Sequence, residues 1–218
     1  MLSTIFSVIK KFPFCRRYTT DQNAKYWRGR SYGWEEYLQT HDHPHRRFIT
    51  HILSQIQWVS LVEIGCGSGP NLVNIVKNLK GRQVGGIDIN PEAIRVAKKT
   101  FQGGHFKAGD AKDILMSDKS CDVSLTDAFL IYIGPARIKK YLAEIKRITR
   151  NYIVLCEYHE ASFWRRQWLR IFSGRHAYNY KQLLSQLGFW DVTIIKMPAF
   201  EKDNDERFRH LILARLPK

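Results

Sequence analysis

Residues 61–69 have the sequence LVEIGCGSG, an apolar run that ends in a Gly-x-Gly-x-Gly turn, and a helical pattern follows. Glycine adopts the positive φ angles of a tight turn and lets the backbone approach a ligand closely. The first turn of the following helix has unpaired N–H groups. Dinucleotide-binding folds space these glycines as Gly-x-Gly-x-x-Gly instead. The segment therefore predicts a strand, a glycine turn and a helix. The turn alone is either a structural turn or a nucleotide-binding loop, and its spacing argues against NAD.

Acidic residues follow the first predicted strands. Glu63 lies two residues before the first glycine, Asp88 comes 19 residues after Gly69, and Asp110 follows a short strand. A carboxylate at the tip of the second strand can accept both hydroxyls of a ribose, and Asp110 could receive the amino group of an adenine. Each acid alone could be a helix cap. Three acids at successive strand ends favour a nucleoside site.

Strand and helix patterns alternate from residue 44 onward, which is typical of a single α/β domain. Strands are predicted at residues 59–64, 83–87, 105–108, 121–126, 152–156, 192–197 and 210–215. Helices are predicted at residues 43–57, 71–80, from 91, at 135–150 and at 180–187. Asn90 is the expected cap of the third helix, and Gly188 ends the last one. A polar loop is expected at 201–206.

The ordered motifs at residues 63–69, Asp88, Asp110 and Asp127 resemble those of class I S-adenosylmethionine-dependent methyltransferases, over roughly residues 44–216. The sequences DAFLIYIGP at 127–135 and EYH at 157–159 resemble a prokaryotic subgroup of small-molecule methylases, including those associated with pseudaminic acid. The resemblance implies a Rossmann-like, mostly parallel seven-stranded sheet with helices on both faces and an antiparallel last strand. The cofactor would lie across the carboxyl ends of strands one to four.

The resemblance further implies that S-adenosyl-L-methionine is the cofactor. It implies an N-terminal lid at residues 1–43, in which Trp27 is also a candidate contact, on a methyltransferase domain at residues 44–218. The residues expected to bind the cofactor are Glu63, Gly65, Cys66, Gly67, Gly69, Asp88, Ile89, Asp110, Ala111, Asp127, Tyr26, Arg30 and Arg46.

Methyl transfer from a sulfonium requires a positioned acceptor and, for a hydroxyl acceptor, a base, a task that suits a neutral histidine. The residues expected to act in catalysis are His159, Asp127 and Glu157. A surface histidine is the alternative interpretation of His159. His43 and His45 in the segment HDHPHRR, residues 41–47, are the rival source of a base. No metal is expected there, because Pro44 disfavours a helical face.

The motif after strand four bears on the acceptor. Enzymes that methylate exocyclic amines of bases usually carry Asn/Asp-Pro-Pro-aromatic where this chain has DAFL at 127–130, and Cys156 lacks the Pro-Cys setting of C5 enzymes. We therefore expect methyl transfer to an oxygen, or a nitrogen, of a small or lipid-linked acceptor. The alternatives are an RNA methyltransferase and a protein that binds S-adenosylmethionine without catalysis.

The chain carries a net charge of +15, from 35 basic and 20 acidic residues. Such a charge attracts RNA, DNA, an anionic membrane surface or phosphorylated substrates, although a merely solvated basic surface is the alternative. The segment FWRRQWLRIF at residues 163–172 combines aromatic residues with arginines. It could stack on bases, lie at a lipid interface, cap an apolar acceptor or cover the sheet edge.

Residues 1–20 contain no acid and carry apolar residues at helical spacing before a basic run. This pattern fits a membrane-surface helix, an organellar transit peptide or a mobile terminus. No apolar run approaches the ~18 residues that span a bilayer. Four scattered cysteines favour reduced, buried thiols. We expect a cytoplasmic protein, with peripheral membrane association as an alternative.

Overall fold

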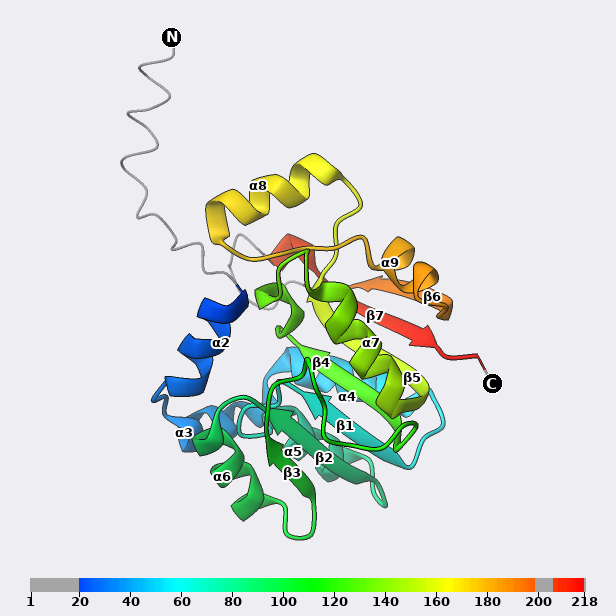
Figure 1. The fold of residues 1–218 in the computed structure, drawn as a ribbon. Coiled ribbons are helices and arrows are strands. Elements are labelled where there is room, and N and C mark those ends of the chain that lie inside the picture. The colour runs from blue at the N-terminus through cyan, green and yellow to red at the C-terminus, as the bar shows by residue number, and fades with distance from the viewer. Residues whose placement is uncertain (1–19, 199–205, 218) are drawn as a thin grey trace.

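Seven strands form one sheet in this computed structural model, which describes residues 20–198 and 206–217 (Figure 1). The strands are β1 (Ser60–Ile64), β2 (Gln83–Asp88), β3 (His105–Ala108), β4 (Cys121–Asp127), β5 (Thr149–Tyr158), β6 (Trp190–Lys196) and β7 (Arg209–Arg215). Their order is β3-β2-β1-β4-β5-β7-β6. Strand β7 is antiparallel to both of its neighbours, whereas the other pairs are parallel. The predicted Rossmann-like sheet is confirmed.

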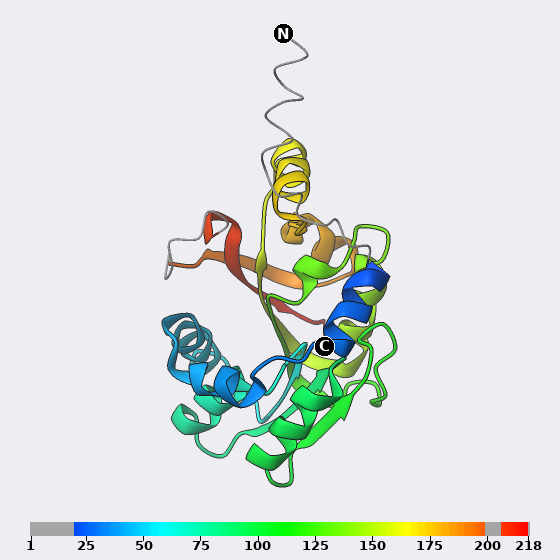
Figure 2. The ribbon, with the colours of Figure 1, turned by 90° about the vertical axis from the view of Figure 1, so that its left-hand side faces the viewer.

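Helices cover both faces of this sheet (Figures 1 and 2). They are α2 (Thr20–Gly29), α3 (Trp34–Gln39), α4 (Pro44–Ser54), α5 (Pro70–Asn78), α6 (Pro91–Thr100), α7 (Ile138–Ile148), α8 (Phe163–Ser173) and α9 (Tyr180–Gln186). Short 3-10 turns occur at Thr40–Asp42, Leu130–Tyr132 and Glu206–Phe208. The predicted helix at 135–150 is shorter than expected, because Thr149 already pairs with Cys121 in the sheet.

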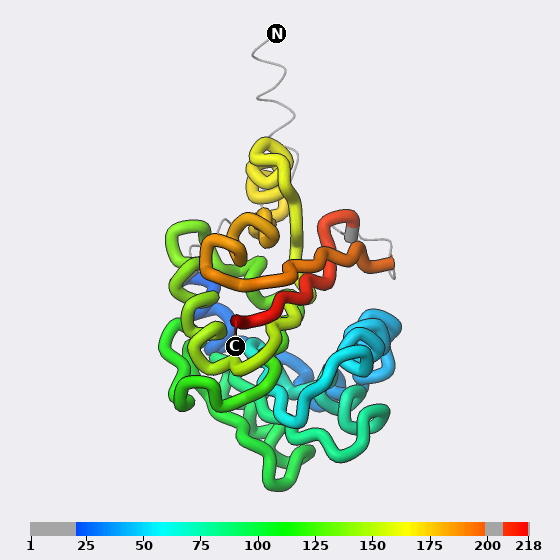
Figure 3. Tube along the Cα trace, turned by 90° about the vertical axis from the view of Figure 1, so that its right-hand side faces the viewer, coloured from blue at the N-terminus to red at the C-terminus, as the bar shows by residue number. Residues whose placement is uncertain are grey.

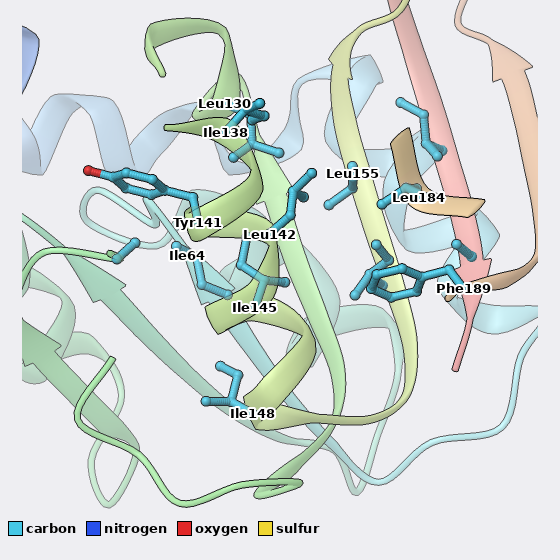
Figure 4. Close-up of a cluster of buried hydrophobic side chains, with 14 of the residues drawn as sticks. Ile64, Leu130, Ile138, Tyr141, Leu142, Ile145, Ile148, Leu155, Leu184 and Phe189 are labelled. Carbon is cyan, nitrogen blue, oxygen red and sulfur yellow. The ribbon is translucent and has the colours of Figure 1, made fainter. Parts of the chain in front are cut away.

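Two apolar clusters, one on each face of the sheet, form most of the core. Helices α7 and α9 cover one face, where Leu142, Ile145 and Leu184 are fully buried against Leu155 of β5 (Figure 4). Helices α4, α5 and α6 cover the other face with a second cluster. Burying one such side chain stabilises the fold by about 1.5–3 kcal/mol. These faces hold the sheet rigid, so the loops at its carboxyl ends are fixed in place.

Local sequence signals set several element ends. The side chain of Asn90 accepts hydrogen bonds from the N–H groups of Glu92 and Ala93 at 2.9 and 3.0 Å, which confirms the predicted cap of α6. Gly188, just after α9, has a φ of +76°, as expected for the end of a helix. Figure 3 shows the sheet edge formed by β6 and β7, which lies below α8.

Some sequence predictions concern parts of the chain outside the described residues. The amphipathic, basic pattern of residues 1–19 is one of them, as is most of the polar loop at 201–206.

Cys66, Cys121 and Cys156 are buried free thiols, as predicted for them. None of the described helices is long and apolar enough to cross a membrane.

Candidate functional site

A cavity of about 270 Å³ lies at the carboxyl ends of the parallel strands. Its walls come from the loops after β1, β2, β3 and β4, from the start of α7 and from the N-terminal helices α2 and α3. The N-terminal residues that line it include Trp27, Arg30, Tyr32, Trp34 and Tyr37. Ligands of open α/β sheets bind at this edge, so this cavity is the candidate site.

The backbone of the glycine turn lies close to aromatic side chains that line the cavity. Gly65 and Gly67 line the cavity with φ angles of +76° and +55°, which favour glycine. A Cβ atom at position 67 would lie 3.1 Å from the ring of Tyr37 and 3.3 Å from that of Trp34. A Cβ atom at position 65 would lie 2.8 Å from Phe129. Glycine is therefore needed here both for the turn and for the aromatic residues that close the cavity.

Asp88 lines the cavity beyond β2. Its carboxylate accepts hydrogen bonds from the backbone N–H of Gly67 and of Asn90, each at 2.8 Å and each on a different oxygen. Burial raises the pKa of Asp88 from its usual value. A carboxylate oxygen can accept more than one hydrogen bond, so both oxygens retain capacity for the two hydroxyls of a ribose.

Asp110 lines the cavity beyond β3. Its Oδ1 accepts hydrogen bonds from the hydroxyl of Tyr141 at 3.0 Å and from the N–H of Lys112 at 3.1 Å, and its Oδ2 lies 3.1 Å from the Lys112 ammonium. Burial opposes ionisation, but these donors outweigh it and lower the pKa of Asp110. The neighbouring Ala111 and, beyond β2, Ile89 supply apolar wall. This part of the cavity suits the edge and face of a purine.

Asp127 at the end of β4 is the most strongly ionised group of the cavity wall. Its Oδ2 lies 3.0 Å from His45 Nε2, 3.1 Å from the amide nitrogen of Asn71 and 3.6 Å from the Arg46 guanidinium. Burial opposes ionisation, but the charges of His45 and Arg46 hold the pKa of Asp127 well below its usual range. Its Oδ1 is buried and has no hydrogen-bond partner among the described residues.

Two histidines extend from this carboxylate. His45 Nδ1 lies 2.6 Å from Nδ1 of His43, which also caps α4 by accepting the His45 N–H. Since an Nδ1 pair at this distance shares one proton, the ring nitrogens form a chain from His43 through His45 to Asp127. The predicted rival histidines therefore lie behind the cavity wall, in contact with a residue that lines it.

Glu63 contacts Asn71, which in turn contacts Asp127. It lies outside the cavity lining, and its Oε1 accepts a 2.6 Å hydrogen bond from the amide of Asn71, which also reaches Asp127. Burial raises the pKa of Glu63 to about 8. Arg46 also lies outside the lining, where its guanidinium donates to the carbonyl of Thr40 and to Asn71. Both residues position Asn71, which sequence reasoning missed.

Glu157 is fully buried beneath the loop after β4 and does not line the cavity. Its Oε1 accepts from the Thr126 hydroxyl at 2.8 Å and from the N–H groups of Phe129 and Leu130 at 3.0 Å, and its Oε2 accepts from the Ile131 N–H at 3.3 Å. Burial raises its pKa to about 7. Glu157 therefore organises the backbone that carries part of the cavity wall.

His159 also lies outside the cavity lining. Its Nδ1 accepts the backbone N–H of Tyr180 at 3.3 Å, its ring stacks on that of Tyr180, and His210 lies edge-on to it. Burial, with the nearby His210 next in weight, lowers the pKa of His159 to about 4. The structure thus places His159 in contact with α9 and β7, apart from the cavity wall.

Some of the remaining predicted residues line the cavity, and others lie outside its lining. Arg30 lines the cavity, hydrogen-bonds to the Tyr26 hydroxyl and lies over the Tyr26, Trp27 and Tyr32 rings, whereas Tyr26 itself is outside the lining. The Cys66 thiol is buried in the core, and Gly69 is also outside the lining. Sequence reasoning missed the lining residues Asn23, Tyr32, Trp34, Tyr37, Phe129, Tyr132, Ile133 and Tyr141.

Residues 61–151 match the family model described as a methyltransferase domain. No curated protein matches the chain. Among solved structures, one chain of the Haloferax volcanii complex between the Trm112 methyltransferase activator and a methyltransferase is 19% identical, with a TM-score of 0.64 over 87% of this chain and 100% of that one.

Two further structures have the same fold. A SAM-dependent methyltransferase from Methanosarcina mazei is 23% identical, with a TM-score of 0.59 over 76% of this chain and 96% of that chain. The magnesium protoporphyrin IX methyltransferase of Synechocystis PCC 6803, solved with bound SAM, is 12% identical, with a TM-score of 0.59 over 88% of both chains.

The sheet order, the cavity position and the matched domain define one class of protein. The chain is an enzyme with the class I methyltransferase fold, and its cofactor is S-adenosylmethionine. The residues present fit that cofactor, because both oxygens of Asp88 keep acceptor capacity for its hydroxyl groups, and the glycine turn at Gly65 and Gly67 leaves room for its chain.

Proposed function

We propose that this enzyme transfers the methyl group of S-adenosylmethionine to an oxygen, or alternatively a nitrogen, of a small or lipid-linked acceptor. The single observation that carries the proposal is the buried Oδ1 of the cavity-lining residue Asp127, which has no hydrogen-bond partner among the described residues. The bound cofactor supplies a sulfonium-linked methyl group for in-line displacement. The residues of the chain hold the two reactants and accept the proton.

The cofactor half of the cavity follows the order of the strands. We assign the ribose hydroxyls to Asp88, the adenine to Asp110, Ala111 and Ile89, and the turn at Gly65 and Gly67 to the chain of the methionyl group. Glu63, Cys66, Gly69 and Arg46 support these groups from behind, and Tyr26 holds Arg30. Residues 20–43 act as the described part of the lid, because their aromatic rings cover the cavity.

Asp127 is the proposed acceptor contact. A carboxylate that accepts the hydrogen bond of an acceptor hydroxyl stabilises the positive charge that develops on the attacking oxygen, and it can take the proton. His45 is a positioning residue, because it holds Oδ2 at 3.0 Å and leaves Oδ1 for the acceptor. The catalytic roles predicted for His159 and Glu157 remain predictions that their variants can test.

Three features support the acceptor class and the location. The lining combines aromatic rings and apolar side chains with a small number of charged groups, which suits a compact acceptor. The likeness of residues 127–135 to pseudaminic-acid-associated methylases favours a sugar among the acceptors to be tested. The buried free thiols Cys66, Cys121 and Cys156 favour a reducing compartment such as the cytoplasm.

Incubation with methyl-labelled S-adenosylmethionine and separate pools of RNA, lipids, glycans and small metabolites tests the proposal. We expect base-stable or ether-linked label in the lipid, glycan or metabolite pools, and no label in RNA. Label only in RNA would contradict the acceptor class and favour the RNA alternative. Cofactor binding without transfer to any pool would favour a non-catalytic binding protein.

A further inference from the structure

Helix α8 exposes an apolar stripe. Trp164, Trp168, Ile171 and Phe172 are 78%, 45%, 49% and 53% exposed. Their positions, i, i+4, i+7 and i+8, place them on one side of the helix. Surface helices usually turn such a stripe toward the core, whereas α8 turns it outward. Only Leu169 of this helix is buried.

A different side of α8, the side that carries Leu169, contacts the body of the protein. Leu169 packs in a cluster with Ile131 and Tyr158, against which Ala128 and Tyr132 of the cavity wall also pack. The helix extends away from the body of the protein, beyond the carboxyl end of β5 (Figures 1 and 2). Leu169 therefore connects α8 to a cluster that also contacts the cavity wall.

The charges on α8 have a single sign. The helix contains Arg165, Arg166 and Arg170 and no acidic residue. Arg165 pairs with Glu160 at 3.0 Å, and Arg166 donates to two backbone carbonyls just before the helix. Arg170 is exposed on the polar side of α8, about 100° around the helix from Ile171. Tryptophan and arginine beside an apolar stripe are typical of helices that lie in the interface of an anionic membrane.

We propose that α8 docks the enzyme on an anionic lipid surface. The side chains of Trp164, Trp168, Ile171 and Phe172 enter the headgroup region, and Arg170 meets lipid phosphates. A lipid interface accommodates both the aliphatic Ile171 and the aromatic rings, whereas RNA bases need rings to stack on. Self-association through α8 would bring six arginines together without an acid on either helix. This proposal goes beyond the proposed reaction and does not depend on the identity of the acceptor.

The experiment is sedimentation of the full chain with phosphatidylcholine vesicles, with and without phosphatidylglycerol. We expect binding to the anionic vesicles only. The double variant Trp164→Ala/Trp168→Ala should bind roughly tenfold or more weakly, because each ring loses its apolar burial. Trp190→Ala is the matched control, since Trp190 is 62% exposed on β6, and it should bind as the unmodified chain does.

A second pair of variants tests the charge. Arg170→Gln should weaken vesicle binding by about fivefold, the effect of one basic residue near an anionic surface. Lys98→Gln, an exposed residue of α6, should leave binding unchanged. All variants should keep their affinity for S-adenosylmethionine, which shows that they remain folded.

Each contrary result would overturn the proposal. Absence of binding by the unmodified chain excludes a lipid surface, and equal binding by the double variant assigns the contact to another part of the chain. Loss of RNA binding in the double variant, without any vesicle binding, would instead make α8 a nucleic-acid contact. Dissociation of a dimer by the double variant would make it a contact between copies.

Discussion

Two neighbouring strands end in carboxylates that differ in what surrounds them. Asp127 ends β4 and Glu157 lies one residue before the end of β5, and both side chains are largely or fully buried. Asp127 keeps one oxygen without a partner among the described residues, and its cationic neighbours lower its pKa. Glu157 has donors on both oxygens, and burial raises its pKa to about 7.

The comparison shows that the position of a carboxylate at the sheet edge does not decide whether one of its oxygens is free to bind a ligand. Both residues lie at the carboxyl edge, where substrates of such sheets bind. Glu157 accepts hydrogen bonds from the backbone of residues 129–131, whereas Asp127, which lines the cavity, has a buried Oδ1 without a hydrogen-bond partner among the described residues. We therefore expect a carboxylate at this edge to act on a ligand only where the surrounding residues leave one of its oxygens without a hydrogen-bond partner.

The largest expected effect tests this comparison directly. Asp127→Asn should lower turnover by about 10²–10⁴-fold at saturating cofactor, because the amide can neither take the proton nor stabilise the developing charge. Glu157→Gln is the matched variant and should lower turnover by less than about tenfold, since the amide oxygen can still accept backbone hydrogen bonds. Steady-state kinetics with the identified acceptor decide. Equal losses in both variants would remove the distinction drawn here.

The next effect concerns the cofactor half of the cavity. Asp88→Ala should weaken S-adenosylmethionine binding by the ~1.5–3 kcal/mol of a hydrogen bond to a charged group. Glu92→Ala provides the control, because Glu92 is an exposed acid of α6 that pairs with Arg95. Calorimetry of both variants checks the assignment. Unchanged affinity in Asp88→Ala would show that the ribose is held elsewhere.

The two histidine candidates predict different outcomes. His45→Ala should lower turnover roughly tenfold, because Asp127 loses the partner that fixes its Oδ2, while His159→Ala should change it less than about threefold. A general base at His159 would instead require a loss of about 10²–10⁴-fold. A His45→Gln variant should recover part of the activity if His45 only positions Asp127. Normal activity in His45→Ala would refute the positioning role.

The last prediction concerns the dependence of stability on pH. The pKa of Glu157 rises from 4.5 in the unfolded chain to about 7 in the fold, so the folded state binds more protons between these values. The free energy of unfolding therefore falls as pH rises from about 4.5 to 7, by on the order of 1 kcal/mol per pH unit. Glu63 extends the same trend to about pH 8.

Urea unfolding at several pH values measures this slope. Glu157→Gln should reduce the slope between about pH 4.5 and 7 and leave the part due to Glu63, which extends from about pH 4.5 to 8. Asp127 has the opposite sign, because its pKa is lowered, so its contribution is present above about pH 3.8 and is lost as pH falls further. A slope that Glu157→Gln does not alter would contradict the raised pKa.

Short-range patterns predicted the fold and the cofactor half of the site. The glycine turn, the acids Asp88 and Asp110 and the cap at Asn90 each act within a few residues of their own strand or helix. Parallel strands then bring their carboxyl ends together without further information. Residues 61–69 and the alternation that follows were therefore sufficient to predict the seven-stranded sheet, and Asp88 and Asp110 line one cavity at its carboxyl edge.

The acceptor half depends on contacts that periodicity does not encode. The bond between His45 and Asp127 joins residues 82 positions apart, and the lid aromatics reach the cavity only after α2 and α3 fold back over it. His159 was predicted from its place after β5, but its ring packs against Tyr180 and His210. Three-dimensional packing decides which carboxylate has an oxygen without a hydrogen-bond partner, and the sequence pattern does not reveal this.

The most direct test of the central claim is a calorimetric titration of the full chain with S-adenosylmethionine and, separately, with NAD. The geometry of the cavity predicts S-adenosylmethionine binding in roughly the micromolar range, about −8 kcal/mol, and no binding of NAD. Binding of NAD, or of neither ligand, would contradict the account of this cavity as a methyl-donor site.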